Sequence, residues 1–166
     1  MKKILVAYST KDGSTAEVAE AIGKALREKG LEVEVARISG IRDLAGFDGA
    51  VLGSAINGMR WMPEASTFAE ANAAALRAMP TALFYLSYIE FGGGRNLWKS
   101  SIRKGMDALA ASVGAFSVRG FGGKLAAPLP PSARFLFGTR ADAPADLRDW
   151  AAVGSWAAEI APRLGA

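Results

Sequence analysis

The sequence predicts an α/β domain in which a parallel sheet is covered by helices on both faces. Short apolar segments rich in β-branched and aromatic residues alternate with amphipathic segments of helical period. The first apolar segment contains no alternating polar residues, as expected for a strand that is buried on both faces. The 166 residues contain no internal repeat and no linker, so residues 1–166 are expected to form a single domain.

Five strands and four helices are expected along the chain. Residues 3–8 (KILVAY) form the first strand, and the helix at 14–29 has apolar residues at three- and four-residue spacing with Gly30 as a stop signal. Residues 31–38 alternate polar and apolar, which is typical of an exposed or edge strand. The remaining strands are expected at 49–53, 81–87 and 115–121, and the remaining helices at 63–79, 99–113 and 145–164. Residues 122–143 are rich in proline and glycine and are expected to form a loop.

The composition excludes several kinds of catalytic and metal-binding site. The chain has no cysteine and no histidine, which excludes disulfides, thiolate nucleophiles and imidazole bases and removes most zinc, haem and iron–sulfur sites. No metal site is therefore predicted, and catalysis requires a bound cofactor or carboxylates. The net charge is +4, but residues 1–79 sum to zero and residues 80–140 to +6, so the positive field belongs to the later half. The basic residues form no run and no helix-turn-helix or zinc-finger spacing, so nucleic-acid binding is not expected.

The first residues resemble the basic start of a signal peptide. The apolar stretch that follows, residues 4–7, ends at Tyr8-Ser9-Thr10 and is too short for a signal core or a membrane span. We therefore expect a cytoplasmic protein.

The connection between the first strand and the first helix carries an unusual number of hydroxyl groups. It consists of Ser9, Thr10, Lys11, Asp12, Gly13, Ser14 and Thr15. Four hydroxyls, a glycine for a tight turn and the free N–H groups of a helix start together favour binding of a phosphate dianion. The alternative is a simple helix cap, which needs only one hydroxyl. The spacings typical of nucleoside-triphosphate and dinucleotide loops are absent.

The pattern Tyr8-x-Thr10-x-x-Gly13-x-Thr15-x-x-x-Ala19 after an N-terminal strand resembles the flavodoxin signature. In that family this loop holds the phosphate of FMN, so the resemblance implies FMN as cofactor. It also implies a flavodoxin-like, doubly wound, five-stranded parallel sheet of order 2-1-3-4-5. Two residues outside the loop depart from the pattern, namely Ala7 and Gly23.

The resemblance assigns the next two loops to the isoalloxazine ring. In the loop at 54–62 the expected contacts are Ser54, Ala55, Ile56, Asn57, Gly58 and Trp61. The Asn57-Gly58 peptide could flip with the redox state of the flavin. The alternative to a ring contact is a plain loop whose tryptophan packs at the domain edge. In the loop at 87–96 the expected contacts are Ser87, Tyr88, Phe91, Gly92 and Gly93. Here Tyr88 would cover the other face of the isoalloxazine ring. The alternative interpretation is that the glycines of this loop form only a flexible connector.

Three further features have open interpretations. Glu90 is the only acid in the third loop and is a candidate proton donor or acceptor for a substrate, whereas a solvated loop glutamate is the common case. The segment 134–137 (RFLF) is consistent with contact to a membrane surface, an acidic partner or a hydrophobic carboxylated substrate, or with ordinary core packing. Three tryptophans are expected to serve in packing: Trp98, Trp150 and Trp156.

Within the flavodoxin-like family, the chain most resembles the menaquinone-dependent protoporphyrinogen dehydrogenase branch. Beyond the first loop, the matching segments are Val51-Leu52-Gly53-x-x-Ile56, Met79-Pro80, Asp149-Trp150-x-x-Val153 and Ala158-Glu159-Ile160-Ala161. The glycine after Ile56 is shifted relative to that branch, and residues 122–143 are shorter than its insertion.

This resemblance implies an FMN-dependent oxidoreductase. It would transfer electrons between a small-molecule donor, with protoporphyrinogen IX as one candidate, and a quinone-type acceptor, with peripheral membrane contact through residues 122–143. The alternative is a flavodoxin-type electron carrier that docks on redox partner proteins. Such carriers are typically strongly acidic, whereas this sequence has a pI near 9.6. A third reading is a binding or regulatory module that has kept the fold without redox work.

Overall fold

The computed structural model describes residues 1–166 and contains the expected parallel sheet. Its parallel strands are β1 (Lys3–Ser9), β2 (Glu32–Arg37), β3 (Gly49–Asn57), β5 (Thr81–Ser87) and β6 (Ser117–Gly122). They are arranged in the order β2-β1-β3-β5-β6. Counted in chain order without the short antiparallel strand β4, this is the order 2-1-3-4-5, so the predicted fold class and sheet order are confirmed.

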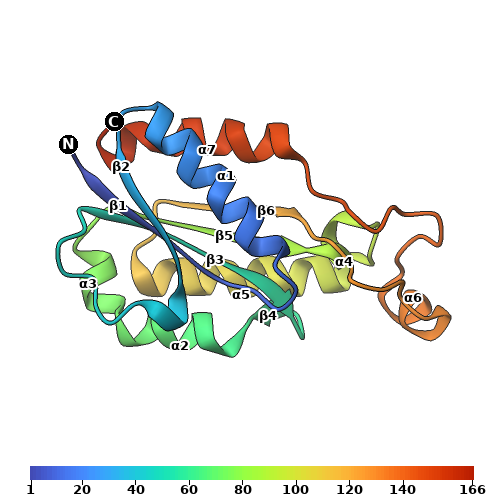
Figure 1. Ribbon diagram of the computed structural model, residues 1–166. Coiled ribbons are helices and arrows are strands. Elements are labelled where there is room, and N and C mark those ends of the chain that lie inside the picture. The colour runs from blue at the N-terminus through green and yellow to red at the C-terminus, as the bar shows by residue number, and fades with distance from the viewer.

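Helices cover both faces of the sheet (Figure 1). Helices α1 (Ser14–Glu28) and α7 (Trp150–Leu164) lie on one face, and α2 (Pro63–Ala71), α3 (Ala73–Arg77) and α5 (Asn96–Val113) lie on the other. Each face has its own apolar cluster, one including Val6 and Trp156 and the other including Leu5 and Trp61. Neighbouring strand residues such as Leu5 and Val6 therefore face different clusters, which explains the uninterrupted apolar sequence of the central strands.

The chain leaves the sheet after β6 and returns before α7, and residues 124–146 of this excursion are called the lobe below. The lobe projects from the end of the sheet where α1 begins (Figure 1). It contains a helix, α6 (Pro131–Phe137), so the prediction that residues 122–143 form only a loop was wrong. The carbonyls at the end of α6 accept hydrogen bonds from the start of α5: Arg95 donates to Phe135 (2.9 Å) and Phe137 (2.8 Å), and the Trp98 indole to Leu136 (3.0 Å). These distant partners satisfy a helix end that local sequence leaves open.

Strand β3 also differs from the sequence expectation. It continues beyond Gly53 to Asn57, and a two-residue turn returns the chain as β4 (Arg60–Trp61). Both turn residues, Gly58 and Met59, have positive φ angles (62° and 65°), which is the geometry of a tight hairpin turn. Most of the predicted loop at 54–62 is thus a hairpin that fixes the backbone at the end of the sheet.

Three predicted helices have different bounds. The helix expected at 63–79 is divided into α2 and α3, where the Asn72 side chain donates to the Phe68 carbonyl oxygen (2.9 Å). Helix α5 begins earlier than expected, at Asn96, and α7 begins later, at Trp150. The late start follows from an N-cap at Asp149, whose carboxylate accepts the Ala152 N–H (3.0 Å).

The tryptophans divide between core and surface. Trp156 is fully buried, as predicted, and Trp98 packs edge-on against Phe137 of the lobe. Trp150 was predicted on the apolar stripe of the last helix, but it is 46% exposed and stacks with Arg148. None of the helices is both long enough and apolar enough to cross a bilayer.

Candidate functional site

The connection between β1 and α1 forms a tight turn with free backbone donors. Gly13 adopts a φ of 87° at the helix N-cap, and its N–H donates to the Thr10 hydroxyl (3.0 Å). The N–H groups of Ser14, Thr15 and Ala16 have no acceptor within the protein. Free N–H groups and the helix dipole make such a helix start favourable for an anion.

The Thr15 side chain supports this assignment independently. Its hydroxyl is fully buried and has no hydrogen-bond partner. A buried hydroxyl left unpaired costs about 1–3 kcal/mol, so a ligand oxygen that pairs with it stabilises the loop. Together with the free N–H groups, this orphaned hydroxyl fits a phosphate monoester at the start of α1.

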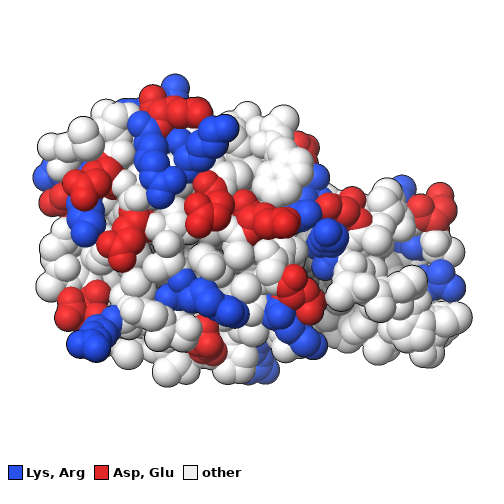
Figure 2. Space-filling view, in the orientation of Figure 1, with Lys and Arg blue, Asp and Glu red and all other residues white.

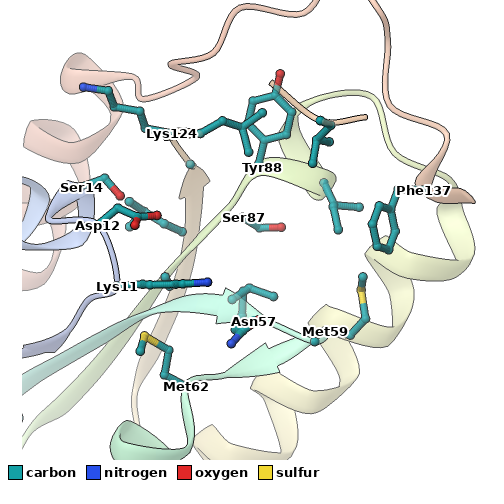
Figure 3. A pocket seen from close by; sticks show the side chains of 18 residues that line it. Lys11, Asp12, Ser14, Asn57, Met59, Met62, Ser87, Tyr88, Lys124 and Phe137 are labelled. Atoms are coloured by element: carbon teal, nitrogen blue, oxygen red, sulfur yellow. The ribbon is translucent and has the colours of Figure 1, made fainter. Parts of the chain in front are cut away.

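A cavity of about 390 Å³ extends from this turn along the carboxyl ends of the strands to the lobe (Figure 3). The size lies in the usual range for cofactor sites. Half of the flavin contacts predicted from the sequence line it: Lys11, Asp12, Ser14, Ala55, Ile56, Asn57, Gly58, Ser87 and Tyr88. The structure therefore brings together the three predicted loops, and the individual contacts stay predictions.

The other predicted contacts do not line this cavity: Ser9, Thr10, Gly13, Thr15, Ser54, Trp61, Phe91, Gly92 and Gly93. Several have other partners. The Ser9 hydroxyl donates to Glu64 (3.1 Å), and the Ser54 hydroxyl accepts the N–H of Met62 (3.1 Å). Trp61 is only 1% exposed and belongs to the apolar cluster beneath the sheet, so its placement favours the packing interpretation over a ring contact.

The loop after β5 contains one short helix, α4 (Tyr88–Phe91), which separates its side chains. Tyr88 and Ile89 line the cavity, whereas Glu90 and Phe91 line a separate hollow between α5 and the edge strand β6. The Tyr88 hydroxyl points out of the cavity and donates to the Pro144 carbonyl oxygen (2.8 Å) (Figure 3). The helical turn thus explains why only part of this loop faces the predicted site.

Glu90 has a structural environment that neither sequence interpretation anticipated. It is 6% exposed, so it is not a solvated loop residue. Its carboxylate accepts hydrogen bonds from the Tyr85 hydroxyl and the Arg103 guanidinium, both at 2.8 Å. Burial, followed by the hydrogen bond to the Glu90 carboxylate, raises the pKa of Tyr85 well above its usual value. Because Glu90 faces away from the cavity, its placement does not support a role in proton transfer there.

Sequence reasoning missed the other half of the residues that line the cavity. They are Met59, Met62, Leu86, Ile89, Gly123, Lys124, Leu125, Leu129 and Phe137. The last four belong to the lobe, and only the RFLF segment had signalled that this region carries more than a connector. The cavity is consequently polar at the α1 end and apolar at the lobe end.

The charged groups lie at the polar end. Residues 9–16, which form the connection between β1 and the start of α1, are called the phosphate turn below. The Lys11 ammonium points into the cavity, and Lys124 extends from the lobe on the other side of the phosphate turn (Figure 3). Asp12 is the one acid in the lining, so the apolar end holds no carboxylate that could move a proton. The protein groups here can bind an anion, support a flat ring and exclude water, and redox chemistry requires a cofactor.

Comparisons with known proteins agree with this geometry. A 28% identity over 89 residues relates the chain to the protoporphyrinogen IX dehydrogenase [quinone] of Escherichia coli strain K12, over 52% of this chain and 49% of that protein. The proteins of strains CFT073 and O157:H7 match equally. The chain spans about half the length of these curated relatives.

Solved structures show the same fold at low identity. An archaeal flavodoxin matches with a TM-score of 0.62 and 17% identity over 99% of both chains. An oxidoreductase from Corynebacterium diphtheriae matches with a TM-score of 0.62 and 17% identity, over 99% of this chain and 97% of that chain. The rubredoxin oxygen:oxidoreductase of Desulfovibrio gigas gives 0.63 and 12% over 99% of this chain and 36% of that one.

A family model described as a flavodoxin domain matches residues 5–129, which include most of β1, the strands β2 to β6 and all three loops. The free N–H groups of the turn and the adjoining cavity agree with this match: the chain belongs to the flavodoxin family, and its cofactor is FMN.

Proposed function

We propose that this protein is an oxidoreductase that transfers electrons through FMN between an organic substrate and a quinone-type acceptor. The observation that carries the proposal is the apolar end of the cavity, where Phe137, Leu129 and Leu125 of the lobe face Met59 and Ile89. Bound FMN supplies the redox chemistry. The phosphate turn would hold its phosphate, and the apolar side chains would exclude water and orient a flat organic molecule.

The E. coli relative is named for protoporphyrinogen IX and a quinone, which suggests the substrate class. A porphyrinogen of that kind is large, mostly apolar and carries carboxylates. The segment 80–140 has a net charge of +6 and would attract such an anion to the apolar end. A role purely as an electron carrier is less well supported. Acidic carriers dock on basic surfaces of their partner proteins, whereas a chain with a pI near 9.6 is better suited to attract an acidic small molecule.

The proposal is tested by steady-state turnover of protoporphyrinogen IX with menadione. Phe137→Ala removes a wall of the apolar end, and we expect kcat/KM to fall about tenfold, because burial of roughly 50 Å² of apolar surface is lost. Phe135→Ala is the matched control, since Phe135 lies on the same helix but is 79% exposed. Absence of turnover together with rapid reduction by a reductase protein would instead assign the carrier role.

The tip of the lobe favours a location at a lipid surface. Phe135 and Leu136 are 79% and 55% exposed, and Leu97 at the adjoining start of α5 is 70% exposed. Figure 2 shows the lobe as a protrusion with a largely uncharged front and both basic and acidic residues at its edges. Apolar tips bordered by Arg95 and Arg134 match an anionic bilayer, where a quinone would be dissolved.

Flotation with vesicles tests this part of the proposal. We expect the protein to float with phosphatidylglycerol vesicles and less with phosphatidylcholine, and the double variant F135S/L136S to remain unbound. Phe91→Ser is the control, because Phe91 is also exposed (43%) but lines the separate hollow between α5 and β6. Equal flotation of the double variant and the unaltered protein would refute contact through this tip.

A further inference from the structure

The base of the lobe is closed by a short antiparallel pairing. The Leu125 N–H donates to Ala145 (2.8 Å), and the Leu147 N–H donates to Gly123 (3.0 Å). Between these bonds, Lys124 and Asp146 form an isolated β-bridge. The two ends of the lobe are therefore fixed to each other before the chain enters α7.

One buried side chain joins this base to the first turn of α1. The Arg148 side chain is 5% exposed, and its Nε and Nη2 donate to the two oxygens of Asp146 at 2.9 and 2.8 Å. Its Nη1 donates to the Ser14 carbonyl oxygen (3.4 Å) and to the Glu17 carboxylate. Arg148 is thus bound at once to the lobe and to the helix start that presents free N–H groups.

The same contacts control the charge beside the phosphate turn. A groove over the start of α1 is lined by Asp12, Glu17 and Lys124. A phosphate dianion placed at this helix start is repelled by the nearby carboxylates, and Arg148 compensates two of them, Glu17 and Asp146. The hydrogen bonds and charge of the Arg148 guanidinium lower the pKa of Asp146 to about 2 and also lower the pKa of Glu17, as expected where a cation compensates these two carboxylates.

We propose that Arg148 is a positioning residue that couples FMN binding to the placement of the lobe. It holds the first turn of α1 in the conformation that receives the phosphate and, with the same guanidinium, holds the base of the lobe beside it. Because both ends of this link involve the same side chain, FMN strengthens the attachment of the lobe, and the attached lobe strengthens FMN binding to the same extent. The inference goes beyond the electron-transfer proposal, since it concerns binding and needs no substrate.

The test compares FMN with riboflavin, which lacks the phosphate. Arg148→Met keeps most of the side-chain volume and removes the charge and the hydrogen bonds. In titrations followed by flavin fluorescence, we expect FMN affinity to fall about tenfold, within the usual range for coupled sites, while riboflavin affinity changes little. Arg119→Met is the matched control, because Arg119 forms an exposed ion pair with Glu159 (3.0 Å) far from the turn, and both affinities should stay unchanged.

Proteolysis of the lobe provides a second readout. FMN should protect residues 124–146 of the unaltered protein from cleavage more than riboflavin does, and Arg148→Met should abolish the difference. Arg148→Lys keeps the positive charge but not the bidentate hydrogen bonds to Asp146, so it should retain only part of the preference for FMN over riboflavin. This variant also keeps the test usable if Arg148→Met does not fold. Equal losses of FMN and riboflavin affinity, or unaltered FMN affinity in both variants, would overturn the proposal while leaving the electron-transfer function open.

Discussion

The phosphate turn and the lobe form opposite ends of one cavity, and they are built in different ways. The turn places its essential groups within residues 9–16: a glycine with positive φ, an orphaned threonine hydroxyl and three free N–H groups. The lobe depends on residues distant in sequence, such as Arg95 and Trp98 at its tip and Arg148 at its base. The proposed recognition of the cofactor phosphate is thus local, whereas the wall that would receive a substrate is assembled by tertiary contacts.

The two ends also come from parts of the chain that differ in net charge. The turn belongs to the half of the chain with no net charge, while the lobe belongs largely to the segment with +6. Fixed backbone dipoles are sufficient to bind a phosphate, whereas attraction of a large anionic substrate needs a broad positive field. The difference indicates that residues of the lobe beyond its base can alter substrate choice without altering the binding of the cofactor phosphate.

The largest expected effect comes from removing the lobe beyond its base. Replacing residues 126–144 by a tight turn retains Lys124, Asp146 and Arg148 but removes Leu129 and Phe137 from the cavity. We expect turnover of a porphyrinogen with menadione to fall about a hundredfold, equivalent to roughly 100 Å² of lost apolar burial. The ratio of FMN to riboflavin affinity should stay at its original value in the same preparation. A collapse of that ratio would show that the two ends are not separable.

The next largest effect is expected from the ion pair between Arg103 and Glu90, on the side of α4 that faces away from the cavity. Arg103→Met leaves the buried Glu90 carboxylate without its cationic partner. Because the Arg103 side chain is 64% exposed and Tyr85 still donates to Glu90, we expect the free energy of unfolding to fall by only about 1–2 kcal/mol in urea titrations. The FMN-to-riboflavin ratio should not change, because Glu90 faces away from the cavity. Lys104→Met serves as the control at the next, exposed position of α5. A variant as stable as the control would mean that the pair contributes nothing to the fold.

A smaller effect distinguishes two threonines of the turn. Thr15→Val removes a buried unpaired hydroxyl, so the unfolding free energy without cofactor should stay constant or rise by about 1 kcal/mol, while FMN affinity falls about tenfold. Thr10→Val instead removes the acceptor of the Gly13 N–H and should lower that stability by about 1 kcal/mol. Calorimetry combined with flavin titration separates the two outcomes. Unchanged FMN binding in both variants would reduce the turn to a helix cap.

The smallest effect is a pH dependence confined to the lobe. Arg148 lowers the pKa of Asp146 from an ordinary 3.8 to about 2 in the folded protein. A carboxyl with a lowered pKa contributes stability above its ordinary value and loses that contribution as the pH falls through the folded value. Pepsin cleavage of residues 124–146, normalised to an unstructured peptide, should therefore increase between about pH 4 and 2. Asp146→Asn should show no such increase, and identical curves for both proteins would contradict the assignment.

Local patterns in the amino-acid sequence were sufficient for a parallel sheet, most helices and the hydroxyl-rich turn, whereas the order of the strands was implied only by the resemblance to flavodoxins. Apolar periodicity identifies strands and helices because each depends on neighbours within a few residues, and the turn was recognisable because its hydroxyls, glycine and helix start are contiguous. The resemblance to flavodoxins, carried by those residues, supplied the cofactor.

Contacts between residues far apart in the sequence decided where the other side chains lie. No local spacing indicates that Glu90 is paired with Arg103, that Trp61 lies beneath the sheet, or that Arg95 and Trp98 complete helix α6. In each case the deciding contact joins segments far apart in the chain or buries a group that sequence alone leaves exposed. Because a buried polar group must find a partner wherever the folded backbone brings one, these placements follow from the packed structure and not from residue order.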